Sequence, residues 1–321
     1  MPTLAPCQGV TLVDDLARVE AELRSVGHDA GSVLHEAIHH HLSTGGKRLR
    51  PRLALLAGRV AGGDVSPELV RFATITELVH AASLVHDDTL DDSPTRRGVE
   101  TVRSRYGNHL AVLVGDYLFA QAAILTASLG SLRLMALLAE TIQSLVQGEL
   151  AQLSAAYRIE ASAENYESRI AAKSASLFVF AAEGGAVQAG AVEEQARALR
   201  NYAHYLGLAF QIADDVLDYT ASADELGKPA GSDLANGVVT LPALYYLERV
   251  PPDAVERRLI EEGGDMTRVI AAIRASDGPA RALARARALA AAAADALCAF
   301  PPSPERDALH DLAAVTTGRR S

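Results

Sequence analysis

Apolar residues recur at helical spacing along nearly the whole chain, and this periodicity constrains the fold more than any other feature of the sequence. We find no convincing run of alternating apolar and polar residues bounded by turn residues, which is the signature of a strand. Long helices are predicted at about 108–129, 131–157, 164–189 and 192–219. The sequence therefore predicts an all-α protein, a large single-domain bundle of mostly antiparallel helices.

The best-defined predicted helix follows Ser66. Ser66 is a preferred N-cap residue, Pro67 fits the first helical position, and Glu68 places a carboxylate in the first turn. One face of this segment carries Leu69, Phe72, Ile75, Val79 and Ser83. We therefore expect a continuous helix that ends near Asp87.

Composition sets the class of protein and limits its partners. The chain has 321 residues, of which 49% are hydrophobic and 22% charged, so a large globular core is possible. The formal net charge of −10 excludes a broad cationic surface for nucleic acid, and any anionic ligand must be held locally. No strong linker divides the chain. Residues 1–321 are expected to form one domain, with the motifs at about 45–242 and further helices at 243–321.

The cysteines and the N-terminus favour a cytoplasmic protein. Cys7 and Cys298 provide no disulfide framework, which favours a reducing compartment. The N-terminal residues contain no basic run before an apolar stretch, so neither a secretory signal nor a transit peptide is predicted. The longest uncharged apolar stretch, 117–132, is too short and too interrupted to cross a bilayer, so we expect no transmembrane segment.

Three aspartates follow the helix that begins at residue 67. Asp87 and Asp91 lie one turn apart on the same helix face, with Asp88 beside them. Two carboxylates at this spacing repel each other, and a hard divalent cation such as Mg²⁺ is the natural compensation. These aspartates are therefore candidate metal ligands.

The same spacing recurs at Asp214, Asp215 and Asp218, at the end of a second apolar helix. Solvated acids at a helix end would explain either group alone. However, acidic side chains stabilise the N-terminal end of a helix, and both groups lie at a C-terminal end. Two violations of the same local preference are typical of a functional site.

Mg²⁺ held by carboxylates usually keeps phosphate oxygens among its ligands, so phosphate-binding cations are expected nearby. Three segments supply them: GGKRLRP at 45–51 with Lys47, Arg48 and Arg50, TRRG at 95–98 with Arg96 and Arg97, and the Gly-rich segment 225–234 with Lys228. The last segment is expected to act as a mobile lid.

These segments, in their order and spacing, resemble the trans-isoprenyl diphosphate synthase (polyprenyl synthetase) family over roughly residues 45–242. The matching segments are GGKRLRP, HAASLVHDDTLDDSPTRRG, VLVGDYLFA, QGE at 147–149, KSASLF at 173–178, LAFQIADDVLDY and GKPAGSDLANGVVTLP.

The resemblance implies a fold and a reaction. The fold would be a helical bundle of the isoprenoid synthase type around a central cavity, with the two aspartate groups facing each other at its mouth. About three Mg²⁺ ions would bind there and stabilise the departing diphosphate of an allylic substrate. The double bond of isopentenyl diphosphate would then attack the allylic cation, and loss of a proton would give a longer all-trans allylic product. The resemblance also suggests a homodimer.

The resemblance assigns roles residue by residue. Metal ligands would be Asp87, Asp91 and Asp214, with Asp88, Asp215 and Asp218 in support. Ligands of the allylic diphosphate would be Arg96, Lys173, Gln211 and Lys228, with Ser174 where the family often has threonine. Ligands of isopentenyl diphosphate would be Lys47, Arg50, His80 and Arg97. The catalytic set would combine Asp87, Asp88, Asp91, Lys173, Gln211, Asp214 and Asp215.

Product length is expected to depend on Val79, Ala82 and Ser83, one and two turns before Asp87. Bulky residues near these positions resemble a floor that stops growth in short-chain relatives, and Ala82 and Ser83 are small. We therefore expect a long-chain polyprenyl product, with a geranylgeranyl or farnesyl diphosphate synthase as the alternative. Val238 stands where the family often has lysine, which removes one possible diphosphate contact.

Two other functions are consistent with parts of the sequence. His80, His86 and Asp87 could be ligands of a metal phosphohydrolase, although this leaves the second aspartate group unexplained. A non-catalytic subunit of a synthase is expected to have lost part of an aspartate group, and here both are complete. The histidines at 35, 39, 40 and 41 are expected on a polar helix face, with no metal role.

Overall fold

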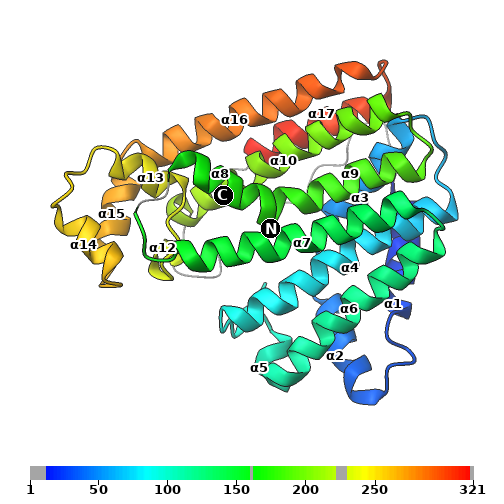
Figure 1. The fold of residues 1–321 in the computed structure, drawn as a ribbon, viewed down its shortest axis with the longest axis horizontal. Helices are drawn as coiled ribbons and strands as arrows, with labels where there is room; N and C mark the ends of the chain where they lie inside the picture. Colours follow the sequence, from blue (N-terminus) through cyan, green and yellow to red (C-terminus); the bar gives the residue numbers. More distant parts are fainter. Residues whose placement is uncertain (1–11, 160–161, 222–229, 319–321) are drawn as a thin grey trace. The chain divides into compact units, whose positions relative to one another are not determined.

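The computed structural model describes residues 12–159, 162–221 and 230–318. Lys228 and Cys7 therefore lie outside the described residues. The described chain is mostly helical and has only two short strands, which confirms the predicted all-α class (Figure 1). Its helices are α1 Val13–Ser25, α2 Ser32–Ser43, α3 Leu49–Val60, α4 Pro67–Leu90, α5 Val102–Tyr106, α6 Asn108–Ser128, α7 Leu132–Ala155, α8 Ala163–Ile170, α9 Ser176–Gln188, α10 Glu193–Thr220, α12 Ser232–Ala235, α13 Leu241–Leu247, α14 Val255–Glu261, α15 Thr267–Ala275, α16 Gly278–Ala296 and α17 Pro304–Thr317, with a 3₁₀ turn at Leu297–Ala299.

Helix α4 begins where the sequence predicts. The Ser66 hydroxyl accepts a hydrogen bond from the Leu69 amide at 3.1 Å, and Pro67 occupies the first turn. The helix continues to Leu90, three residues beyond the expected end at Asp87. Asp91 is its C-cap residue, so the first aspartate group spans the last turn of α4.

A small hairpin departs from the purely helical prediction. Strands β1 Thr95–Arg96 and β2 Val99–Glu100 pair antiparallel, with Arg96 opposite Val99. The two residues between them, Arg97 and Gly98, have φ angles of 55° and 78°. Positive φ at both central residues is what a type I′ turn requires. Strands of two residues are too short to show any alternation, so the periodicity of the sequence could not reveal them.

The chain forms two compact units. Unit 1 contains residues 1–142, 177–200 and 297–309. Within it, α4 packs against α1, α3 and α6 (Figure 1). Gly184 of α9 allows a very close approach, because a Cβ there would lie 2.1 Å from Cζ of Phe72 on α4. Phe72 in turn packs edge-on against Phe180 at a centroid distance of 5.2 Å.

Unit 2 contains residues 143–176, 201–296 and 310–321. Its core includes Tyr166 of α8, Ile212 and Tyr219 of α10, and Ala282 and Ala286 of α16, all fully buried. Helix α16 packs against α13 (Figure 1). The buried positions of α16 are mostly small, such as Ala282 and Ala286, which allows a close approach. The helix predicted at 164–189 is interrupted by a π-helical turn at Ala171–Ala175, which contains Lys173.

Two helical segments, Asn108–Ser128 and Ala163–Gln188, are long and apolar enough to cross a membrane by length and composition alone. The core helix of a soluble protein passes the same test, so two such helices are weak evidence for a membrane span. In the second segment 61% of the most apolar part is buried inside the protein, and in the first segment 33%.

Candidate active site

The three aspartates at the end of α4 differ in their surroundings. Asp91 is exposed and Asp87 is half-buried, and the Asp91 amide donates to the Asp87 carbonyl at 2.9 Å. Asp88 is only 3% exposed. Arg96 donates to its carboxylate through Nε at 2.9 and 3.0 Å and approaches it through Nη2 at 2.8 Å. Asp88 therefore anchors Arg96 of the β1–β2 hairpin to the end of α4.

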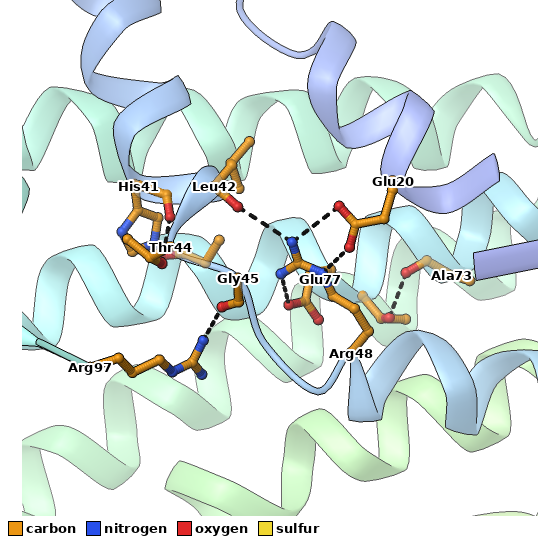
Figure 2. Close-up of polar contacts among 11 residues, drawn as sticks. Glu20, His41, Leu42, Thr44, Gly45, Arg48, Ala73, Glu77 and Arg97 are labelled. Carbon is orange, nitrogen blue, oxygen red and sulfur yellow. Dashed lines mark hydrogen bonds and ion pairs between the residues drawn. The ribbon is translucent and has the colours of Figure 1, made fainter. Parts of the chain in front are cut away.

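The hairpin also joins two of the predicted cationic segments. The Arg97 guanidinium donates through Nη1 to the Gly45 carbonyl (Figure 2). A Cβ at Gly46 would lie 2.9 Å from the same Nη1, so a larger residue there would displace Arg97. The TRRG and GGKRLRP segments, separated by more than forty residues in sequence, are thus in contact within unit 1.

Arg50 and His80 are desolvated cation-forming groups with polar atoms that lack partners. Arg50 Nε and His80 Nδ1 are both buried, and neither has a hydrogen-bond partner among the described residues. The Arg50 guanidinium lies 5.1 Å from the centroid of the Phe178 ring. A buried donor without a partner is costly, and it indicates a missing acceptor.

The pKa values of these groups report the same surroundings. Burial lowers the pKa of Arg50 to about 10, an effect that the charge of Glu77 opposes and that of Arg97 reinforces. Burial lowers the pKa of His80 well below its ordinary value, and the nearby charges of Arg50 and Arg97 lower it further. His80 is therefore neutral at pH 7. Positively charged groups that lie close together and are shielded from water favour the binding of an anionic ligand.

A hydrogen-bonded chain orients the second aspartate group within unit 2. Buried Asp215 accepts from the Tyr166 hydroxyl at 2.6 Å and from Gln211 Nε2 at 2.7 Å. The Ser174 hydroxyl donates to Gln211 Oε1 at 2.7 Å, which fixes the orientation of the amide. Burial raises the pKa of Asp215 to about 8, and the charge of Asp233 contributes.

The other two aspartates of this group differ in their surroundings: one faces solvent, and the other is hydrogen-bonded to the start of α12. Asp214 is exposed, whereas Asp218 is 2% exposed. Asp218 accepts from the Ser232 hydroxyl at 2.9 Å and from the Asp233 amide at 3.2 Å. Its backbone carbonyl accepts from the Gly231 amide at 2.7 Å. Asp218 therefore fixes the first turn of α12.

Lys173 lies in the π-helical turn and pairs with a residue from the QGE segment. Its Nζ lies 2.5 Å from Glu149 Oε2. Gly148 permits this contact, because a Cβ there would lie 2.6 Å from the Lys173 backbone nitrogen. At the position where the family often has lysine, Val238 is followed by Val239, whose carbonyl accepts from Arg169 Nη2 at 2.9 Å.

The residues expected to control product length lie on α4. Val79 and Ala82 are fully buried. Ser83 is half-buried, and its hydroxyl donates to the His80 carbonyl at 2.8 Å. His86 turns toward α6, where its Nε2 lies 3.2 Å from the Val112 carbonyl and 3.5 Å from the Asp116 carboxylate.

The donor types suit Mg²⁺. Both aspartate groups offer only carboxylate oxygens, which a hard cation prefers. Among the residues that the structure describes, no group of three or more His, Cys, Asp or Glu side chains is arranged to hold a metal ion. Mg²⁺ usually takes only one or two carboxylates and completes its coordination with water and substrate phosphate, so the residues present fit this ion.

The structure corrects one expectation about the histidines. His41 does not lie on a polar face: it is 8% exposed, and its Nε2 lies 3.0 Å from the Ala81 carbonyl of α4. Its backbone carbonyl accepts from the Thr44 hydroxyl at 2.8 Å, so the end of α2 is fixed beside α4 (Figure 2).

His41 is expected to make stability depend on pH. Burial lowers its pKa from 6.5 to about 4, against the hydrogen bond to Ala81 and with help from the charges of Arg96, His40 and Arg97. Between these values the unfolded chain binds a proton that the folded chain does not, so stability falls as the pH falls from about 6.5 to 4, by up to about 3 kcal/mol. The free energy of unfolding, measured with urea at several pH values in this range, should depend less on pH in His41→Gln than in the parent protein. An equal dependence on pH in the two proteins would contradict the assignment to His41.

Several residues of the site were not predicted. Tyr166 and Glu77 carry no local signal, because each acts through partners far away in sequence. Glu149 lies in the QGE segment at 147–149, but its pairing with Lys173 could not be predicted from spacing. The described residues place Lys47, exposed, in the loop between α2 and α3.

Comparison with known proteins identifies the family. A model of the polyprenyl synthetase family matches residues 31–275. Heptaprenyl diphosphate synthase component 2 from Geobacillus stearothermophilus is 40% identical over 304 residues, which cover 94% of this chain and 95% of that protein. Octaprenyl diphosphate synthase from Haemophilus influenzae is 40% identical over 280 residues, 86% of this chain and 85% of that one.

A solved structure agrees with the sequence comparisons. A polyprenyl synthase from Caulobacter crescentus, complexed with calcium and isoprenyl diphosphate, is 35% identical and superposes with a TM-score of 0.91, covering 97% of this chain and 96% of that one. The match extends over both units and confirms the predicted isoprenoid synthase type of fold. This chain belongs to the polyprenyl synthetase family and is a prenyltransferase.

Proposed function

We propose that this protein condenses an allylic diphosphate with isopentenyl diphosphate, repeatedly, to make a long-chain all-trans polyprenyl diphosphate. The observation that carries the proposal is the desolvated cationic cluster in unit 1. Arg50 and His80 present buried nitrogens without partners among the described residues, and Arg97 lies close enough to lower the pKa of both. A diphosphate would supply the acceptor oxygens and the negative charge that this cationic cluster lacks.

The cluster is assigned to the diphosphate of isopentenyl diphosphate. Arg50, Arg97 and Lys47 would neutralise its charge. His80 is uncharged at pH 7, so it would contribute a hydrogen bond and no positive charge. Arg96 is held by Asp88, which fixes its direction for the allylic diphosphate.

The allylic diphosphate is assigned to Lys173 and Gln211, with Arg96 and Lys228. The pairing of Lys173 with Glu149 and the chain from Ser174 through Gln211 to Asp215 hold these groups before substrate binds. Groups that are oriented in advance need no reorganisation during the reaction. In the proposed step, the allylic C–O bond breaks and its electron pair leaves with the diphosphate. The double bond of isopentenyl diphosphate then forms the new C–C bond, and the departing diphosphate takes the proton released.

About three Mg²⁺ ions per site are part of the proposal. Asp87, Asp91 and Asp214 would hold them, supported by Asp88, Asp215 and Asp218. When bound, Mg²⁺ neutralises the charge that develops on the departing diphosphate. The exposure of Asp91 and Asp214 and the internal hydrogen bonds of Asp88, Asp215 and Asp218 support this division of roles.

We also propose a single-domain, cytoplasmic homodimer. One family model matches across both units, which supports a single domain. Helix α6 carries the exposed apolar side chains of Val112, Leu113 and Ile124, at 44%, 57% and 59% exposure, and a second copy would cover them. A relative named as component 2 of a heptaprenyl diphosphate synthase gives the alternative, in which a different subunit covers this face.

Purified protein tests the proposal directly. Incubation with labelled isopentenyl diphosphate, Mg²⁺ and farnesyl or geranylgeranyl diphosphate should give products well beyond twenty carbons, resolved by chromatography. Addition of chelator should stop the reaction. Products that end at fifteen or twenty carbons would make it a short-chain synthase. No product from the chain alone would indicate a non-catalytic subunit or one that requires a partner.

A further inference from the structure

Arg48 belongs to the GGKRLRP segment, which is expected to supply phosphate-binding cations, but the proposed function assigns a diphosphate only to Lys47 and Arg50 of this segment. It is the N-cap residue of α3 and has a left-handed backbone conformation, with φ 46° and ψ 44°. A non-glycine residue adopts this conformation only where surrounding contacts hold it. Its sequence neighbours are Lys47 and, two positions on, Arg50. The conformation of Arg48 therefore decides where both of these diphosphate ligands point.

The contacts that hold Arg48 come from two helices on either side (Figure 2). Its Nη1 donates to Glu77 Oε1 of α4 at 2.8 Å. Its Nε and Nη2 both donate to the Glu20 carboxylate of α1, the second at 3.2 Å. Nη2 also lies 3.3 Å from the Leu42 carbonyl. The side chains of Arg48 and Glu77 are only 12% and 9% exposed. The Arg48 guanidinium is therefore neutralised by two carboxylates, and its donors are used within the protein.

The same loop is held at its other end. Gly45, three residues before Arg48, accepts a hydrogen bond from Arg97 (Figure 2). The loop from Gly45 to Arg48 is thus fixed between Arg97 and the Arg48 ion-pair cluster, which we define as Arg48, Glu20 and Glu77. Lys47 lies between the two attachments, and Arg50 follows in the first turn of α3.

We propose that Arg48 is a positioning residue for isopentenyl diphosphate, and that its ion pairs with Glu20 and Glu77 hold Lys47 and Arg50 in place to bind it. The inference rests on the proposed function, because it takes Lys47, Arg50 and Arg97 as ligands of that substrate. It also gives α1 a part in the site. Glu20 precedes residue 31, where the match to the family model begins.

A substitution at Glu77 can show whether this residue acts by holding Arg48 in position or only by its negative charge. Its negative charge lies near the cationic cluster, where it raises the pKa of Arg50. If charge alone mattered, Glu77→Gln would strengthen diphosphate binding, because it removes a competing anion. If Glu77 acts by holding Arg48, the same substitution weakens binding. The sign of the change therefore discriminates between the two roles.

The chain provides a matched control. Arg59 of α3 pairs with Asp15 of α1 at 2.6 Å, so this ion pair joins the same two helices as Arg48 and Glu20. Its partly buried side chains, 24% and 12% exposed, lie near the other end of α3, away from the loop. Arg59→Lys loosens α1 from α3 without touching the loop.

The experiment compares Glu20→Gln, Glu77→Gln and Arg48→Lys with Arg59→Lys and with Arg50→Ala as the reference for a direct ligand. Each full-length variant is checked for folding by thermal unfolding. The KM for isopentenyl diphosphate, the KM for the allylic substrate and kcat are measured separately. Calorimetric titration with isopentenyl diphosphate gives the binding affinity independently of turnover.

We expect Glu20→Gln and Glu77→Gln to raise the KM for isopentenyl diphosphate about tenfold and to weaken its binding equally, because small displacements of binding groups have large effects. The KM for the allylic substrate and kcat should change less than about twofold, as should every constant of Arg59→Lys. Arg48→Lys should behave like the glutamine variants, since an ammonium cannot bridge two carboxylates as a planar guanidinium does.

Two outcomes overturn the inference, and they can be told apart. If Arg50→Ala leaves the binding of isopentenyl diphosphate unchanged, the proposed substrate site is wrong and the role of Arg48 falls with it. If Arg50→Ala weakens binding but Glu20→Gln and Glu77→Gln match Arg59→Lys, or Glu77→Gln binds more tightly, the substrate site stands and the positioning role is wrong.

Discussion

Replacing Asp87 or Asp214 by asparagine should lower kcat by about a hundred- to thousandfold or more while leaving the protein folded. Each substitution removes one carboxylate that we assign to Mg²⁺, and a lost stabilising contact to the departing diphosphate acts on the transition state. For Asp87→Asn the free energy of unfolding should not fall, because Asp87 lies in the last turn of α4, where a carboxylate is unfavourable beside a helix C-terminus and beside Asp91. Asp214 is exposed, so Asp214→Asn should change the free energy of unfolding little.

The neighbouring carboxylate of Asp92 provides the control for this prediction. Asp92 is exposed, pairs with Arg103 and lies immediately after Asp91. Its φ of 52° is left-handed, a conformation that asparagine tolerates well. Asp92→Asn therefore removes one nearby negative charge without altering the backbone, and its turnover should stay within about twofold of the parent enzyme. Steady-state turnover at several Mg²⁺ concentrations makes the comparison, and full activity in Asp87→Asn or Asp214→Asn would contradict the metal assignment.

The helices could be predicted because their signals are local. Ser66 caps α4 through a hydrogen bond to Leu69, three residues away, and any reader of the sequence can recognise this pattern. The aspartate groups could be singled out for the same reason, since their members lie within one turn of a helix. Their assignment to a family needed only the order of the motifs along the chain.

The partners of the site residues could not be predicted, because they are distant in sequence. Arg48 meets Glu20 across 28 residues and Glu77 across 29, and nothing in either helix marks these two glutamates as partners. His41 belongs to a run of histidines on a short helix, and only the position of α4 makes it a buried residue. Local pattern thus identifies the groups that carry the chemistry, while packing between helices selects the groups that orient them.

Asp88 illustrates how local sequence pattern and packing between elements together define the site. Spacing places it beside the face that Asp87 and Asp91 share, but it does not show what Asp88 contacts. The structure distinguishes their burial, because Asp88 is buried and paired with Arg96, whereas Asp87 is half-buried. The turn that follows α4 is responsible, since the Ser93 amide donates to the Asp88 carbonyl at 3.0 Å and Arg96 then reaches the Asp88 carboxylate only eight residues later. One motif therefore supplies both a candidate metal ligand and the anchor of a candidate diphosphate ligand.

Replacing Ser83 by phenylalanine should shorten the product. In the proposed function, the growing chain extends from the Asp87 face of α4 toward the start of the helix. Ser83 lies one turn before Asp87, about 6 Å along the axis, and Val79 about 12 Å. Ser83 is half-buried, whereas Ala82 is fully buried. A larger side chain at position 83 can therefore fill the path of the growing prenyl chain without being forced into the protein core.

The series Ser83→Ala, Ser83→Leu and Ser83→Phe separates volume from the loss of the hydroxyl. Alanine removes the hydrogen bond to the His80 carbonyl but adds no volume, so its products should match those of the parent enzyme. Leucine should shorten the product partly, and phenylalanine should shift it toward about 15 to 20 carbons, with a possible overpacking cost of ~1 to 3 kcal/mol. Product chromatography and thermal unfolding give both quantities. A folded Ser83→Phe enzyme with an unchanged product distribution would place the control of chain length on another helix, because a ring this close to Asp87 can be passed only if the chain takes a different path.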